Sequence, residues 1–82
     1  MADNVKEDLA RRAVAIEIIA AMIGTLESRK QKKNTTPEVI ARIEAEAEML
    51  RRERAEIYSG NKETIAKALT VYAKEIRVQR ER

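Results

Sequence analysis

Residues 13–23 read AVAIEIIAAMI and form the most apolar run of the chain, with Glu17 as its single charge. The run is far shorter than the ~20 apolar residues that a membrane-spanning helix needs. It contains neither glycine nor proline, and the whole chain has only Gly 2 and Pro 1. Because these residues are the strongest breakers of helices, their scarcity favours long helices. The run therefore predicts a core helix.

The helix around this run is predicted to extend from about residue 5 to about residue 29, with Asn4 as its N-cap and Glu7 as the capping partner. At 100° per residue it carries two apolar stripes. The first contains Val5, Leu9, Ile16, Ile19, Ile23 and Leu26, and the second contains Val14, Ile18, Ala21 and Met22. A helix that is apolar on most sides is buried on most sides. We expect it to be either the central element of the fold or part of an oligomer interface.

Two further helices are predicted at about 37–58 and 62–80. Thr36, Pro37 and Glu38 give an N-cap, a proline in the first turn and an acid beside the positive helix end. Gly60 suits the left-handed position past a helix end, and Asn61 can cap the helix that follows. The third helix has an apolar stripe that contains Ile65, Ala68, Leu69, Tyr72 and Ile76.

Short connections make consecutive helices antiparallel neighbours. The sequence therefore predicts one all-α domain over 1–82, either an up-down-up three-helix bundle or a long helical hairpin plus a third helix. A chain of 82 residues has a thin core, and without cysteine it has no disulfide to support that core. We expect self-association into a homo-oligomer.

Missing residue types exclude most catalytic and metal chemistry. The chain has no histidine and no cysteine, which removes the commonest general base, the commonest transition-metal ligand and any thiol nucleophile. Its two glycines, Gly24 and Gly60, form no phosphate-binding loop. We therefore expect no enzyme, no cofactor and no metal site. Residues 1–8 are charged and lack the apolar region of a signal peptide, so we expect a cytoplasmic protein without membrane association.

In an up-down-up bundle, the first loop and the end of the third helix meet at one pole. Basic residues would then gather there as an anion-binding site: Arg29, Lys30, Lys32, Lys33, Arg77 and Arg80. One interpretation is contact with nucleic-acid phosphates without base specificity. The other is ordinary charging of helix ends and loops, which favours the helix dipole and solubility.

Two other side chains, Arg54 and Tyr58, each allow two interpretations, and a third, Tyr72, allows one. Arg54 falls on the apolar stripe of the second helix, where it either pairs with Glu17 or extends to solvent at the bundle end. Tyr58 either packs over the tight turn or anchors a partner, because tyrosine is enriched at binding hot spots. Tyr72 lies on the third apolar stripe and is predicted to be in the core.

These observations predict a small non-enzymatic module for protein–protein interaction, such as an adaptor, regulator or inhibitor, of a type common in mobile elements. Its contacts with a partner or a second copy are predicted at five positions: Val14, Ile18, Met22, Leu26 and Tyr58. The alternative is a nucleic-acid-associated protein that uses the basic pole. A structural subunit of a larger assembly is a third reading of the same pattern.

Overall fold

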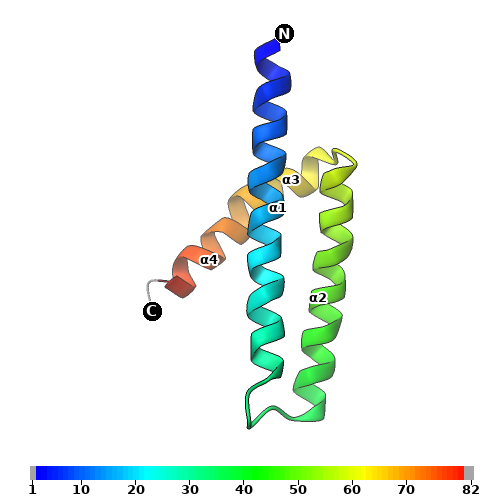
Figure 1. Ribbon diagram of the computed structural model, residues 1–82, viewed down its shortest axis with the longest axis vertical. Coiled ribbons are helices and arrows are strands. Elements are labelled where there is room, and N and C mark those ends of the chain that lie inside the picture. The colour runs from blue at the N-terminus through cyan, green and yellow to red at the C-terminus, as the bar shows by residue number, and fades with distance from the viewer. Residues whose placement is uncertain (1, 81–82) are drawn as a thin grey trace.

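A computed structural model describes the backbone of residues 2–80 and the side chains of residues 6–79. Within that range the chain is helical and contains no strand (Figure 1), which confirms the predicted all-α fold. Its elements are α1 (Ala2–Lys30), α2 (Pro37–Tyr58), α3 (Lys62–Lys67), the π-helical turn η1 (Ala68–Tyr72) and α4 (Ala73–Arg80). The start of α1 was predicted too late, since the backbone of Asn4, the predicted N-cap, lies inside the helix.

An antiparallel hairpin of α1 and α2 forms the long axis of the molecule (Figure 1). The loop between them is closed by Thr35, whose hydroxyl donates to the carbonyl of Lys32 at 2.8 Å. Thr36 then caps α2, because its hydroxyl oxygen accepts from the amide of Val39 at 3.3 Å, and Pro37 occupies the first turn. The predicted start of the second helix is confirmed.

A tight turn at residues 59–61 ends α2 and starts α3. Gly60 has a φ of 86°, the left-handed conformation expected from its position. The side chain of Asn61 accepts from the amide of Thr64 at 3.1 Å and caps α3 as predicted.

The third helix, formed by α3, η1 and α4, crosses α1 obliquely instead of running alongside the hairpin (Figure 1). Of the two expected arrangements, the chain therefore adopts the hairpin with an added helix, which we call the crossing arm (residues 62–80). The N-terminal turns of α1 extend beyond both α2 and the crossing arm (Figure 1). As a result, α1 is the element on which the other helices pack.

The core lies between the two hairpin helices and under the crossing arm at η1. Its largest fully buried side chains are Ile19, Leu50 and Ile57. The other buried apolar residues are Ala15, Leu26, Ile43, Ala47, Ile65, Ala68 and Tyr72. Tyr72 thus lies in the core as predicted.

Within the single chain α1 is the central element, but it is not buried on most sides, and its expected role in an oligomer interface stays a prediction. Leu9 is 57% exposed and Val14 is 46% exposed. The reason is that α2 and the crossing arm pack on adjacent flanks of α1, so a third flank of the helix has no neighbour.

The polar residue at the core of α2 is Glu53, with only 8% of its surface exposed, and not Arg54. Tyr72 donates its hydroxyl hydrogen to Glu53 Oε1 at 2.5 Å, and Lys67 Nζ donates to Glu53 Oε2 at 3.0 Å. Arg54 is half-buried, and within the described residues no ion pair joins it to the exposed Glu17.

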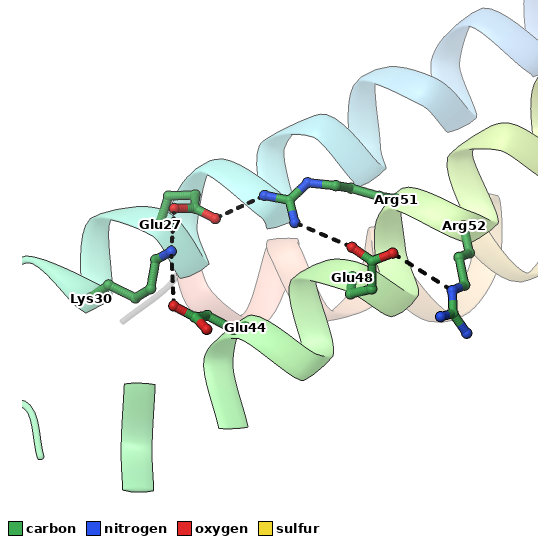
Figure 2. Close-up of polar contacts among 6 residues, drawn as sticks. All are labelled: Glu27, Lys30, Glu44, Glu48, Arg51 and Arg52. Atoms are coloured by element: carbon green, nitrogen blue, oxygen red, sulfur yellow. Dashed lines mark hydrogen bonds and ion pairs between the residues drawn. The ribbon is translucent and has the colours of Figure 1, made fainter. Parts of the chain in front are cut away.

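Ion pairs link the two hairpin helices near the first loop (Figure 2). Glu27 contacts Lys30 at 2.8 Å and Arg51 of α2 at 3.0 Å. The hydrogen bond from Lys30 holds the pKa of Glu27 below its usual value. Glu48 extends the network to Arg51 at 3.8 Å and to Arg52 at 3.7 Å. Such exposed pairs contribute little stability each, so they fix register more than they hold the fold.

No helix among the described residues is both long enough and apolar enough to cross a membrane.

Candidate protein interface

One flank of α1 is not covered by α2 and meets the crossing arm only along one edge, and its exposed residues over 13–24 include a single charge, Glu17. We call this flank the open flank. It spans about a third of the helix circumference at 100° per residue. Its exposed residues are Ala13, Val14, Glu17, Ala20, Ala21 and Gly24. A Cβ atom added at Gly24 would meet no atom within 4 Å, so nothing in the chain packs on this position.

Along one edge of the open flank, α1 and α4 enclose a groove of about 240 Å³, which we call the α1–α4 groove. Val14, Glu17, Ile18 and Ala21 line it from α1, and Ala73 and Ile76 line it from α4. The structure therefore brings together Val14 and Ile18, two of the residues predicted to contact a partner, with Ala21 of the same apolar stripe.

Sequence reasoning missed Ala73 and Ile76 as site residues. Ile76 was placed on the core stripe of the third helix, four residues after Tyr72. Because the crossing arm leaves α1 at an angle, Tyr72 is buried while Ile76 remains half-buried at the groove. The spacing of Ile76 was visible in the sequence, but the angle of the arm was not.

Leu26 and Met22 do not lie on the open flank. Leu26 is only 5% exposed and belongs to the core, and Met22 is half-buried against the core. Both line a small cavity of about 60 Å³ that also contains Arg29 of α1 and Glu75 of α4. In this conformation Leu26 is not available to a partner.

Tyr58 is 63% exposed, so little of its side chain packs over the adjacent turn. It is the last residue of α2 and does not line the α1–α4 groove. Tyr58 therefore belongs to a separate part of the surface.

The basic residues assigned to one pole are divided among different parts of the structure. Lys30 Nζ contacts Glu27 at 2.8 Å and Glu44 at 3.9 Å (Figure 2). Lys32 and Lys33 are exposed in the first loop, whereas Arg77 is exposed on the crossing arm.

The end of α4 lies away from the first loop (Figure 1), because the crossing arm does not run back along the hairpin. Of the basic residues assigned to the pole, Arg29 lines a small cavity together with Glu75 and Gln79 of α4. The side chain of Arg80 lies outside the described residues.

No family model, curated protein or solved structure matches this chain. Within the part of the chain that the structure describes, no three acidic, histidine or cysteine side chains are grouped so that they could hold a metal ion. The candidate interface therefore rests on the geometry of α1 and α4.

Proposed function

We propose that this protein is a small non-enzymatic interaction module that binds an apolar helix of a protein partner on the open flank and in the α1–α4 groove. The observation that carries the proposal is the surface of small and apolar residues on α1 and α4, interrupted by Glu17 alone among the groove residues, in a chain that is 38% charged. Contiguous apolar surface on a small polar protein marks an interaction site more often than isolated apolar residues do.

The shape of this surface favours a helix as the ligand. Alanine and glycine on the open flank allow another helix axis to approach closely, since interaxial distance depends on the side chains at the contact. The adjacent groove then receives the larger apolar residues of the partner helix, as in helix-in-groove recognition. At about 240 Å³ the groove is smaller than the usual 300–1,000 Å³ of small-molecule pockets, which favours a side chain as its occupant.

The alternative function, contact with nucleic-acid phosphates, has weaker support. Lys32 and Lys33 are exposed in the first loop, but Lys30 is engaged by two glutamates. Arg77 belongs to α4, which leads away from that loop (Figure 1), so fewer cations lie together than the sequence predicted. Affinity for nucleic acid depends on the number of phosphate charges that the protein neutralises.

A capture experiment with matched variants tests the proposal. Val14→Lys with Ala21→Lys places two charges on the exposed interface, and Met49→Lys places one on an exposed position of α2, 45% exposed. We expect the tagged wild-type chain and Met49→Lys to retain the same protein partner from native lysate after nuclease treatment. The double variant should fold, as judged by circular dichroism, and lose that partner.

Capture that disappears with nuclease and survives in the double variant would overturn the proposal. It would favour the nucleic-acid alternative, for which Lys32→Gln with Lys33→Gln is the corresponding variant. Sedimentation of the purified chain separates a partner of another kind from a second copy, because only self-association changes the mass of the pure protein.

A further inference from the structure

A second cavity, of about 190 Å³, lies between α1 and the start of the crossing arm. Asp8, Arg11 and Arg12 line it from α1, and Gly60, Lys62 and Ile65 line it from the turn and α3. It shares no lining residue with the α1–α4 groove. The cavity is therefore a separate feature that the proposed function does not use.

Positive charge dominates the lining of this cavity. Arg11, Arg12 and Lys62 contribute three cations, and Asp8 contributes the only carboxylate. Among the described residues no ion pair within 4.0 Å joins any of these four side chains to another group. The lining therefore carries two more positive charges than negative ones. A bound dianion would neutralise this excess.

Arg12 has an unused hydrogen-bond donor at this position. Its Nε is buried and has no hydrogen-bond partner within the described residues. A buried donor without an acceptor is unfavourable, so native structures rarely leave one unmatched. Because that Nε is closed to solvent, an oxyanion in the cavity would be bound by the outer nitrogens of the guanidinium, a group that binds oxyanions well.

Gly60 allows the guanidinium of Arg12 to lie against the turn. A Cβ atom at residue 60 would lie 3.1 Å from Arg12 Nη2 and 3.7 Å from Arg12 Cζ. The left-handed φ of 86° also disfavours any other residue there. The guanidinium of Arg12 thus lies directly against the turn. Ile65 lines the cavity with an apolar side chain, which lowers the local polarity and strengthens hydrogen bonds made there.

We propose that this cavity binds a phosphate-type oxyanion, either free phosphate or the phosphate group of a small monoester. Arg12 and Arg11 would donate hydrogen bonds to its oxygens, and Lys62 would supply a third positive charge. Three cations against one carboxylate fit a dianion better than the single charge of a carboxylate ligand. Asp8 would oppose binding by repulsion.

Titration with inorganic phosphate at low salt, followed by NMR of the arginine side-chain Nε–H and of the Gly60 amide, tests this site directly. We expect saturable shifts at Arg12 and Gly60. Arg12→Gln should weaken binding by about tenfold, the size of effect expected for one charge-assisted hydrogen bond. Arg52→Gln is the matched control, because this side chain is 79% exposed on α2 and should leave phosphate affinity unchanged.

Asp8→Asn distinguishes a binding site from a cavity with a purely structural role, because only a binding site predicts a change in phosphate affinity. Removing the carboxylate should tighten phosphate binding several-fold, since it removes the one like charge in the cavity. Adenosine monophosphate in a parallel titration separates the two sources of the ligand. Tighter binding than inorganic phosphate assigns the site to a phosphate monoester, and equal binding assigns it to free phosphate.

The proposal is overturned if phosphate shifts are spread over all basic residues, or if Arg12→Gln and Arg52→Gln reduce affinity equally. Lys62→Gln provides a second variant on an exposed residue if Arg12→Gln fails to fold, and it should weaken binding while helical content stays unchanged. Unchanged affinity in Lys62→Gln together with no tightening in Asp8→Asn would also rule the site out.

Discussion

Glu53 joins the crossing arm to the hairpin through two hydrogen bonds. Its carboxylate accepts from the Tyr72 hydroxyl at 2.5 Å and from Lys67 Nζ at 3.0 Å. Lys67 Nζ also lies 5.1 Å from the centroid of the Tyr72 ring, within the range of a cation–π contact. Because Glu53 is only 8% exposed, these contacts replace the water that the carboxylate loses on folding.

Replacing Glu53 by alanine should lower the free energy of unfolding by about 2 kcal/mol, since it removes hydrogen bonds to a charged group and leaves the buried Tyr72 hydroxyl without an acceptor. Tyr72→Phe should cost about 1 kcal/mol, because Lys67 still pairs with the carboxylate. Urea unfolding followed by circular dichroism measures both. If Glu53→Ala is as stable as the wild type, the carboxylate does not hold the arm.

Alkaline pH should destabilise the protein through the same cluster. Burial, and then the hydrogen bond to Glu53, raise the pKa of Tyr72 above its ordinary value of 10.0. The contact with Tyr72 and the hydrogen bond to Glu53 likewise raise the pKa of Lys67 above 10.5. The folded state therefore holds these protons more tightly than the unfolded state, and the stability that they contribute is present below about pH 10 and decreases as the pH rises further.

Urea midpoints measured from pH 8 to pH 11.5 check this dependence. Tyr72→Phe removes the contribution of the tyrosine proton, so its midpoint should decrease less steeply above pH 10 than that of the wild type. Parallel curves for the two proteins would contradict the assignment to Tyr72.

At the scale of single elements, helix ends could be predicted from local residues. Thr36 and Asn61 cap the helices at which they were placed, and Gly60 has its expected left-handed φ. The burial of Glu53 was not predicted, because a helical wheel places Arg54 within the apolar stripe of α2 and Glu53 outside it. Which edge becomes buried depends on the side from which the crossing arm approaches α2, and no pattern within α2 carries that information.

The π-helical turn η1 was also not predictable, since no glycine or proline marks it. The amide of Ala73 donates to the carbonyl of Ala68, five residues earlier, and the hydroxyl of Thr70 donates to the carbonyl of Ala66 at 2.7 Å. A π turn contains one residue more than the α-helical turn it replaces. It therefore changes which residues of α4 face α1 relative to a continuous helix.

Deleting Thr70 should convert η1 into ordinary α-helix and keep the residues on either side in phase. We expect this deletion to cost less free energy of unfolding than deleting Ala45, an exposed residue of α2. The Ala45 deletion rotates all later residues of α2 by about 100° and removes Leu50 and Ile57 from the core. Urea unfolding measures the free energy of unfolding of both deletion variants. Equal decreases would show that η1 does not contain one residue more than an α-helix needs.

The molecule as a whole is elongated and thin, with extents of 52 × 27 × 15 Å. Its radius of gyration of 14.6 Å exceeds the value of about 12 Å expected for a compact chain of this length. Such a body cannot surround any of its helices. This explains why Val14, an apolar residue of the predicted second stripe, is 46% exposed, while the groove that it lines with Ala73 and Ile76 depends on the crossing angle.

If a second copy covers the open flank, stability should depend on protein concentration. We expect the midpoint of thermal unfolding to rise as concentration increases, because association favours the folded state by mass action. Val14→Lys with Ala21→Lys should remove that dependence, and Met49→Lys should keep it. A midpoint that stays constant from micromolar to millimolar concentration would exclude a second copy as the group that covers the open flank.

The oblique path of the crossing arm also affects how the molecule tumbles. A body of 52 × 27 × 15 Å rotates faster about its long axis than end over end. Amide bond vectors in α1 and α2 lie close to that long axis, whereas those of α4 are inclined to it (Figure 1). Nitrogen-15 relaxation rates should therefore fall into two groups, and the difference between them measures the inclination of the arm in solution.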